Sequence, residues 1–518
     1  MLGPQELVQT IVEATRPSPR PELVHRLAWG AVLLLSIGLF FLVGRQSSFL
    51  DIDSGPYLSM AHHTRTSGVP RSSFLFVGGA PTLPALANFA PPGVGFIIGV
   101  VALVSGDVMT GAQGLLALAL LVAATAAFLL ARRYANPVFS GFAAALLVSS
   151  PVMVHLAALV LSELPFMAAV LLATWSGARV LAQPGDRRRW LVLGLLAAPL
   201  PLLRYLGLFF VPGFLLAFLI DRKRRSQHRA HALRLAGIVA FGWLPLVLWF
   251  LTLWASGVPL LPQRPPALLG WGKAISGAVA YLSAWSWPFL VGAVLVWAWS
   301  RFGRPRVPAE PGANTDDVRL PAILLLSYVA VLLVSRTRES YYPLEEIGQR
   351  YMAPAWPLVF VAGVAAFHRW VWVRCSTREV LVTALAACTG LVFCIAVAAK
   401  LRLPETFPAG TATFSAAVAA LPEESVVLSS FGQQLTAHRP RVLVLGLPSK
   451  EDFLYHVDLA SLAEQYDLGW VVLFKVDKME RLYGEEVAGW LEQPPQGVTV
   501  LGRTRLADGV IYHISKAH

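Results

Sequence analysis

The sequence GAQGLLALALLVAATAAFLLA at residues 111–131 holds no charged side chain, and Arg132 and Arg133 follow it directly. An α-helix needs about 20 consecutive apolar residues to cross the hydrocarbon core of a bilayer. Basic residues just beyond such a segment are typical of a cytoplasmic loop. The segment therefore predicts a transmembrane helix that ends on the cytoplasmic side.

Similar apolar segments fill the chain from residue 27 to residue 400. Hydrophobic residues make up 56% of the 518 positions and charged residues only 14%, whereas soluble domains carry roughly 25% charged residues. A soluble fold is excluded because the chain lacks the polar surface to cover itself. We predict a polytopic α-helical membrane protein of about eleven spans. The candidate spans are 27–44, 111–131, 138–155, 162–182, 190–203, 205–220, 235–256, 278–300, 320–335, 351–368 and 379–400.

The net charge of +12 comes largely from arginines in the short connections between these segments. This placement is the positive-inside pattern of cytoplasmic loops, so it sets orientation and does not indicate binding to nucleic acid. It places the polar tail 1–26 in the cytoplasm, before a retained signal anchor. The short apolar run 92–105 must then lie along or dip into the outer leaflet, because a full crossing would move Arg132 and Arg133 outside. The runs 190–203 and 205–220 meet at Arg204, which predicts a tight hairpin with this arginine at the outer surface.

The end of the chain, residues 401–518, returns to the composition of a globular protein. Strand-like and helical patterns alternate there, which predicts a small α/β domain. Orientation by the basic loops places this domain outside the cell. No glycine-rich phosphate loop follows its strands, so we assign it no catalytic role. The membrane domain is therefore expected to comprise residues 27–400, with a long first outer loop at 45–110. The predicted strands are 425–429, 441–446, 470–476, 497–501 and 510–515.

Acidic residues collect on the predicted outer side. Asp51 and Asp53 follow the first span closely, and Glu163 begins a later span. A carboxylate fixed at the membrane surface is well placed to act as a base or a metal ligand. The alternatives are solvated loop carboxylates and, for Glu163, a stabilising position at a helix N-terminus that Ser162 caps. The pair His62 and His63 is interpreted as structural, because adjacent histidines rarely converge on one metal ion.

Two arginines are also expected at the outer surface, in the pairs Arg204-Tyr205 and Arg350-Tyr351. Guanidinium groups stay charged and bind phosphate through two parallel hydrogen bonds. The alternative is that these arginines reach lipid headgroups. Phosphate binding is favoured because positive charge is otherwise scarce in the outer loops.

Several short motifs occur in an order that resembles the GT-C superfamily of membrane glycosyltransferases, near the bacterial protein O-mannosyltransferases and the lipid A aminoarabinose transferase. The resemblance covers about residues 27–368. The usual first-loop motif is Asp-Glu placed four residues before a tyrosine. Here Asp53 matches the aspartate and Tyr57 the tyrosine, but Ser54 replaces the glutamate. Other matching segments are Ala90–Gly93, Leu161–Glu163, Leu203–Gly207 and Gln349–Pro354.

The resemblance implies an inverting transfer of a hexose or pentose from polyprenyl phosphate to an acceptor hydroxyl on the outer face of a bacterial plasma membrane. It implies Asp53 as the base, with Asp51 or Glu163 as a second carboxylate. Phosphate or substrate would be bound by Arg204, Tyr205, Arg350, Tyr351 and Tyr57. No cofactor is required, although a divalent metal is possible in this family. The expected partners are the lipid donor, membrane lipids and a glycan, lipid or protein acceptor. The alternatives are a transporter or flippase without chemistry, and a scaffold or sensor.

Overall fold

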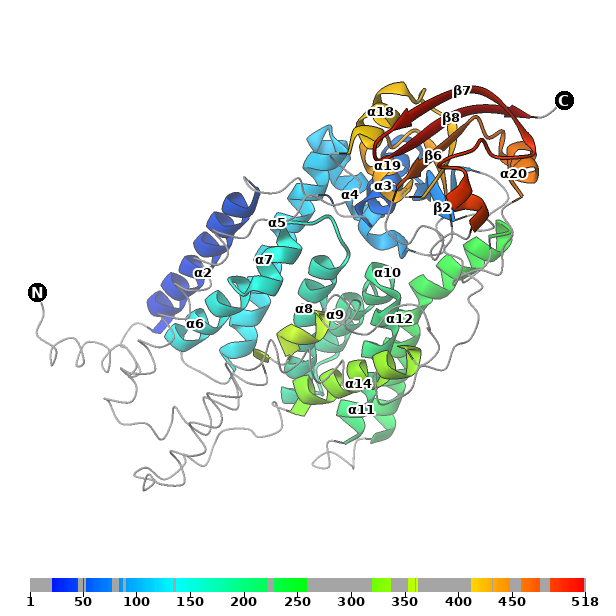
Figure 1. Cartoon of the computed structure of the whole chain (residues 1–518). Helices are drawn as coiled ribbons and strands as arrows, with labels where there is room; N and C mark the ends of the chain where they lie inside the picture. Colours follow the sequence, from blue (N-terminus) through cyan, green and yellow to red (C-terminus); the bar gives the residue numbers. More distant parts are fainter. Residues whose placement is uncertain are drawn as a thin grey trace, which may run out of the picture.

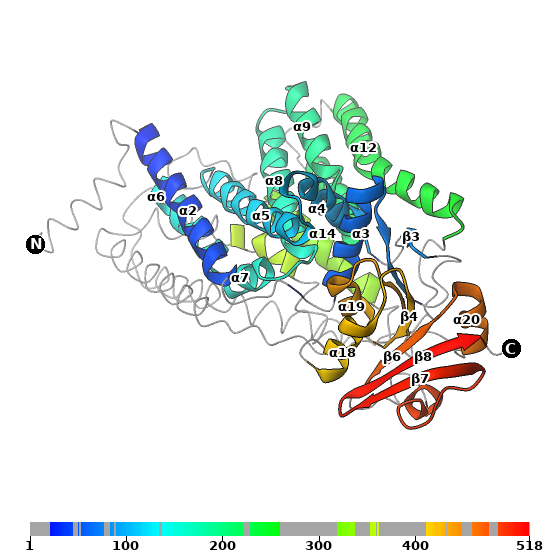
Figure 2. The ribbon, with the colours of Figure 1, turned by 90° about the horizontal axis from the view of Figure 1, so that it is seen from above.

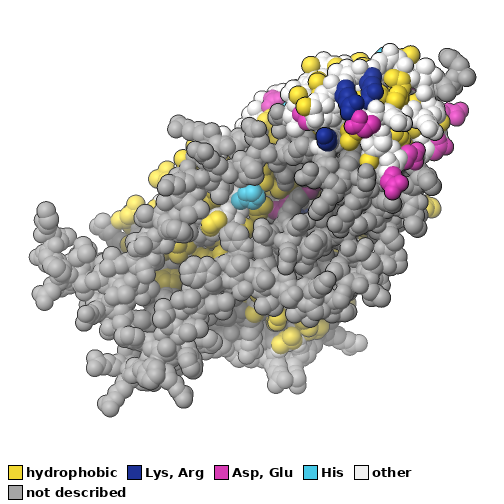
Figure 3. Space-filling model, in the orientation of Figure 1, with side chains coloured by type: hydrophobic (Ala, Val, Ile, Leu, Met, Phe, Trp, Pro, Cys, Tyr) yellow, Lys and Arg dark blue, Asp and Glu magenta, His cyan; other side chains and the backbone are white. Residues whose placement is uncertain are grey.

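The computed structural model joins a bundle of helices to a mixed β-sheet at one end of the molecule (Figures 1 and 2). Charged side chains on the face in Figure 3 gather over the sheet, whereas the visible described side chains of the bundle are mostly hydrophobic. The structure describes residues 21–44, 50, 53–76, 83–86, 90–133, 137–220, 228–258, 319–336, 353–358, 360–361, 411–430, 432–447, 458–475 and 485–516.

The bundle contains the apolar segments that the sequence predicts as spans. Among the described residues, four helices are long and apolar enough to cross a membrane, or five if one bent pair counts as a single span. The predicted spans 278–300 and 379–400, and most of 351–368, lie outside the described residues. The bundle elements are α2 (Pro21–Gly44), α5 (Val108–Ala131), α6 (Pro137–Val148), α7 (Pro151–Ala157), α8 (Glu163–Ala182), α9 (Arg187–Ala197), α10 (Leu200–Leu203), η1 (Tyr205–Phe209), α11 (Phe210–Leu219), α12 (His228–Ala255), α14 (Arg319–Arg336) and η3 (Ala353–Ala355).

The span predicted over 138–155 is broken. Helices α6 and α7 meet at an angle of 58°. Pro151 disfavours the helical conformation at the residue before it, and Ser150 accordingly has an extended backbone with φ −60° and ψ 143°. The Ser149 and Ser150 hydroxyls donate to the carbonyls of Ala145 and Leu147, which satisfies both buried hydroxyls at the end of α6.

The apolar run 92–105 forms one short helix, α4 (Pro92–Ser105). Gly106 ends it in a left-handed conformation with φ +80°, which glycine adopts without strain. Helix α4 packs against α3 (Ser54–Ser67) at close range, because a Cβ on Gly95 would lie 2.5 Å from the Met60 side chain. Phe96, Val100, Leu103 and Val104 are exposed on another side of α4.

The sheet has six strands in the order β2-β5-β4-β6-β8-β7. The first four run parallel, and β8 pairs antiparallel with both β6 and β7. Helices α18 (Ala412–Ala420) and α19 (Gly432–His438) cover one face, and α20 (Leu459–Tyr466) covers the other. The strands are β2 (Phe74–Phe76), β4 (Val426–Ser429), β5 (Leu443–Gly446), β6 (Trp470–Phe474), β7 (Val498–Leu506) and β8 (Gly509–Lys516).

The segment predicted as the first outer loop contributes a strand to this sheet. Strand β2 pairs in parallel with β5, with Phe74 opposite Val444. Two further short strands of the loop, β1 (Arg71–Ser72) and β3 (Ala85–Leu86), pair antiparallel with each other. The hydroxyl of Ser73 donates to the carbonyl of Pro440, which adds a second link to the end of the chain. The sheet therefore joins two regions that the sequence analysis treats as separate.

Helix α19 is held between the sheet and α3. A Cβ on Gly432 would lie 2.4 Å from the Val444 side chain, and a Cβ on Gly55 would lie 1.6 Å from the carbonyl oxygen of Gln433. Only glycine permits both approaches, because any side chain at either position would separate the backbones. The first turn of α3 thereby contacts the first turn of α19.

Candidate active site

A buried ion pair lies at the start of α8. Arg204 Nη1 is 2.5 Å from Glu163 Oε1. Glu163 is fully buried and Arg204 is 8% exposed. Ser162 connects the two side chains, because its hydroxyl accepts a hydrogen bond from Arg204 Nη1 at 3.3 Å and donates to Glu163 Oε2 at 3.4 Å. The structure therefore brings together two residues that the sequence analysis assigned to separate roles.

Local backbone conformation sets this geometry. Glu163 is the first residue of α8, where the positive end of the helix dipole favours a carboxylate. Ser162 occupies the N-cap position, but its hydroxyl makes no capping bond. Arg204 has an extended backbone with φ −150° and ψ 135° between α10 and η1. A Cβ on Gly207 would lie 2.3 Å from the Leu200 carbonyl oxygen, so the turn after Arg204 is tight.

Arg204 is buried within the protein rather than exposed to lipid headgroups. A buried charge is tolerated when an opposite charge and further hydrogen bonds compensate for lost hydration. Glu163 and Ser162 provide both, and they come from a segment about 40 residues earlier in the chain. The sequence around Arg204 holds no signal of this distant partner.

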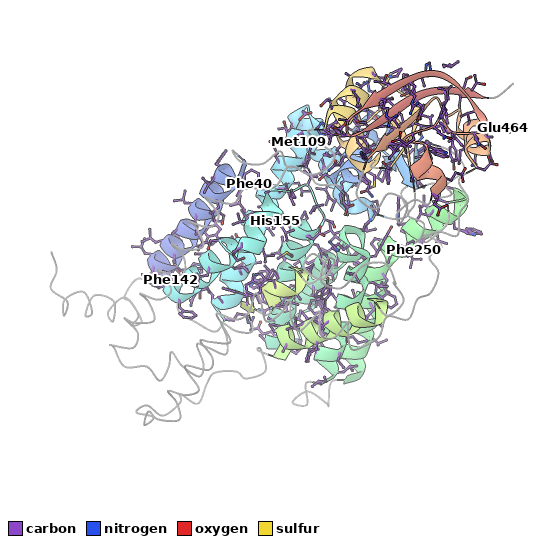
Figure 4. All side chains as sticks on the ribbon, in the orientation of Figure 1. Phe40, Met109, Phe142, His155, Phe250 and Glu464 are labelled. Atoms are coloured by element: carbon purple, nitrogen blue, oxygen red, sulfur yellow. The ribbon has the colours of Figure 1, made fainter. Side chains whose placement is uncertain are left out.

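Tyr205 lies where two of the sequence motifs meet. Its hydroxyl donates to the carbonyl of Ala90 at 3.4 Å, and its ring lies 5.7 Å from the ring of Phe250 on α12. Phe250 is labelled in Figure 4. A Cβ on Gly93 would lie 2.7 Å from the Leu202 carbonyl oxygen, so the start of α4 packs directly on α10. The segments Ala90–Gly93 and Leu203–Gly207 therefore form one packed unit.

Asp53 and Tyr57 lie at the start of α3. Asp53 is the residue before the helix, and its carboxylate makes no capping hydrogen bond. Tyr57 is buried one turn later, where its carbonyl faces Gly95 of α4. Asp51, Arg350 and Tyr351 lie outside the described residues.

The two histidines of α3 differ in environment. His63 Nε2 lies 2.8 Å from the hydroxyl of Ser73, and burial lowers the pKa of His63 to about 4. Burial also lowers the pKa of His62. Among the residues that the structure describes, no three His, Cys, Asp or Glu side chains are grouped closely enough to hold a metal ion.

One buried polar side chain of α19 was not among the candidate residues predicted from the sequence. Gln434 on α19 is 2% exposed, and among the described residues its amide nitrogen and oxygen have no hydrogen-bond partner. A glutamine in a short helical segment carries no sequence signal of function. The packing of α19 on α3 places Gln434 close to the start of α3.

Residues 90–249 match the sequence family described as dolichyl-phosphate-mannose-protein mannosyltransferase. This segment contains Glu163, Arg204 and Tyr205. No curated protein sequence matches the chain significantly.

Solved structures extend the similarity over most of the chain. ArnT from Cupriavidus metallidurans bound to undecaprenyl phosphate superimposes with a TM-score of 0.56 at 13% identity, covering 93% of this chain and 97% of ArnT. The oligosaccharyltransferase AglB from Archaeoglobus fulgidus, in complex with an inhibitory peptide and a dolichol-phosphate, gives 0.52 at 12% identity, covering 88% and 70%. The arabinofuranosyltransferase AftD from Mycobacteria gives 0.51 at 13% identity, covering 94% and 41%. The resemblance to GT-C glycosyltransferases is thereby confirmed, and the chain has their fold.

Proposed function

We propose that this protein transfers a sugar from a polyprenyl-phosphate donor to an acceptor hydroxyl on the outer face of the membrane. The observation that carries the proposal is the family match over residues 90–249, because this segment holds the buried Glu163–Arg204 pair. The GT-C fold over nearly the whole chain adds support. A transporter without chemistry is not favoured, because the family match is to transferases.

Arg204 is the proposed phosphate ligand. Nη1 is engaged by Glu163 and Ser162, and a guanidinium carries five N–H donors in a rigid fork. We propose that this guanidinium binds phosphate oxygens of the donor while the pair with Glu163 fixes its plane. Arg350 is proposed as the second cation of the site. Tyr205, Tyr351 and Tyr57 are proposed to line the donor site, where Tyr205 also holds Arg204 against the start of α4.

Asp53 is the proposed base. Its carboxylate takes the proton from the acceptor hydroxyl as the acceptor oxygen bonds to the anomeric carbon of the donor sugar. The bond between this carbon and the phosphate oxygen breaks, and its electron pair leaves on polyprenyl phosphate. Displacement from the opposite side inverts the anomeric configuration. Asp51 is the alternative base, since it precedes Asp53 by two residues.

Glu163 is better assigned to positioning than to proton transfer. The Glu163 carboxylate is fully buried, is held by Arg204 and lies away from solvent. We therefore assign it the role of orienting Arg204. This assignment leaves Asp53 or Asp51 as the proposed base.

A divalent metal is not required by this scheme. The described carboxylates and histidines form no metal-binding group, so we derive no step through a metal. Another structure of the Archaeoglobus fulgidus enzyme contains zinc and sulfate. Transfer by the present protein is therefore measured with and without EDTA, and unchanged activity is the expected result.

The experiment uses membranes that contain wild type or Asp53→Asn, with a panel of radiolabelled undecaprenyl-phosphate sugars. Transfer by wild type alone, at equal expression, is the result expected. Equal transfer by both proteins moves the base to Asp51. Failure of purified wild type to bind undecaprenyl phosphate in a thermal-shift assay would refute the proposed donor class.

A further inference from the structure

We infer that Gln434, in the sheet-bearing end of the chain, binds a sugar hydroxyl beside Asp53. The inference rests on the proposed function and adds to it a specificity-determining residue. The soluble end of the chain then forms one wall of the active site.

The first observation is that the Gln434 side chain is buried without hydrogen bonds to the residues that the structure describes. It is 2% exposed, and both polar atoms of its amide lack a hydrogen-bond partner within the described part of the chain. Buried polar groups in folded proteins are almost always hydrogen-bonded, because leaving one unpaired is unfavourable. A polar group of a bound ligand would supply the hydrogen bonds that this amide lacks among the described residues.

The second observation is the direction of Gln434 on α19. Gly432 and Leu435 face the sheet, and the backbone of Ala437 approaches Gly55 of α3. Successive residues of an α-helix are about 100° apart around the helix axis. Viewed along this axis, Gln434 lies about 130° from the midpoint between Gly432 and Leu435 and about 60° from Ala437. Gln434 therefore lies on the side of α19 that faces away from the sheet, next to the contact with α3.

The third observation is the short path to the proposed base. Gly55 contacts the backbone of Gln433 and Ala437, and Asp53 precedes Gly55 by two residues. The start of α3 and the first turn of α19 therefore lie together. Because Gln434 belongs to this turn, it lies near the proposed base.

Sheet topology gives the same location independently. The chain leads from β4 through α19 to β5, which neighbours β4 on one side. It then leads from β5 through α20 to β6, which neighbours β4 on the other side. Open α/β sheets bind ligands beyond the carboxyl ends of strands where the connections change direction in this way. Gln434 follows the carboxyl end of β4 by five residues.

The chemistry of an amide selects the ligand class. A glutamine amide offers a donor and an acceptor side by side. A sugar hydroxyl also donates and accepts, so one hydroxyl or an adjacent pair can satisfy both atoms of Gln434. The hydroxyl belongs either to the donor sugar or to a glycan acceptor, and the test separates these sources.

The test compares wild type, Gln434→Met and the control Gln465→Met in detergent. Methionine keeps the length of the side chain and removes its hydrogen bonds. Gln465 is exposed on α20, on the opposite face of the sheet. Gln434→Met should be at least as stable as wild type, because it removes an unpaired buried amide. A large loss of stability would assign Gln434 to the fold and overturn the inference.

Binding is measured as thermal stabilisation by undecaprenyl phosphate alone and by undecaprenyl phosphates that carry mannose, glucose, galactose or arabinose. If Gln434 binds the donor sugar, Gln434→Met keeps the stabilisation by undecaprenyl phosphate and binds the preferred sugar-bearing lipid about threefold to tenfold more weakly. If it binds the acceptor, donor binding is unchanged and the acceptor KM rises by a similar factor.

Equal behaviour of Gln434→Met and Gln465→Met in both assays would overturn the inference and leave the proposed function intact. Absence of any stabilisation of wild type by undecaprenyl phosphate would instead refute the proposed function, and the inference with it. The two failures are therefore distinguishable.

Discussion

Neutralising one partner of the Glu163–Arg204 pair should destabilise the protein strongly. The side chain of Glu163 is fully buried and that of Arg204 is 9% exposed, with 2.5 Å between Oε1 and Nη1. Removal of one charge leaves the other buried without compensation, which costs about 3–5 kcal/mol. We expect this loss for Glu163→Gln and for Arg204→Met, measured as the free energy of unfolding in detergent micelles.

The double variant separates a paired interaction from two independent effects. Replacement of both members of a buried pair by neutral side chains often costs little. We therefore expect Glu163→Gln/Arg204→Met to recover most of the stability lost by either single variant. Transfer should remain absent, because Arg204 is the proposed phosphate ligand. A double variant that loses the sum of the single effects would refute the reasoning.

A surface pair provides the matched control. Arg189 Nε lies 3.1 Å from Asp186 Oδ2, with both side chains partly exposed. Exposed pairs contribute about 0–1 kcal/mol, because water screens the charges. Asp186→Asn should therefore change the unfolding free energy far less than Glu163→Gln does. If Asp186→Asn and Glu163→Gln lose the same unfolding free energy, burial does not strengthen the contribution of the Glu163–Arg204 pair to stability.

Three further predictions concern the junctions around the site. Gly55→Ala should loosen the contact between α3 and α19, because the added Cβ would lie 1.6 Å from the Gln433 carbonyl oxygen. Limited proteolysis should then release the end of the chain. Cleavage as slow as in wild type would contradict this contact. Because burial lowers the pKa of His63 from 6.5 to about 4, its neutral form stabilises the fold above pH 6.5, and this contribution is lost as the pH falls towards 4. The thermal midpoint of His63→Gln, which can still bond to Ser73, should fall less over this interval than that of wild type. Gly207→Ala should displace Arg204 and raise the donor KM, since its Cβ would lie 2.3 Å from a carbonyl oxygen; an unchanged KM would count against the tight turn.

Local sequence signals predicted the elements whose ends are marked by residue type. The apolar run predicted at 92–105 has the same bounds as α4, which has proline in its first turn and Gly106 as its C-cap. Each of the five strands predicted near the end of the chain contains or overlaps one observed strand. These elements depend on patterns within a few residues, which a sequence displays directly.

Contacts between distant segments could not be predicted in the same way. The hairpin at Arg204 was predicted from the cost of an arginine within a span, but its neighbours give no sign that Glu163 compensates its charge. Strand β2 was missed because it has only three residues and pairs with a strand near the other end of the chain. The predicted roles of Asp53 and Arg350 depend on family resemblance, and they remain proposals.

The pairing of β2 with β5 also determines how late in synthesis the sheet can form. Phe74–Phe76 is synthesised about 370 residues before its partner Leu443–Gly446 is complete. At roughly 5–20 residues per second, this interval is on the order of 20–70 s. During that time the side chain of Phe74 lacks the neighbours near the end of the chain that later bury it. The nascent loop must therefore be protected until the last strands emerge, and an interrupted chain leaves an open sheet edge available to other unfinished chains.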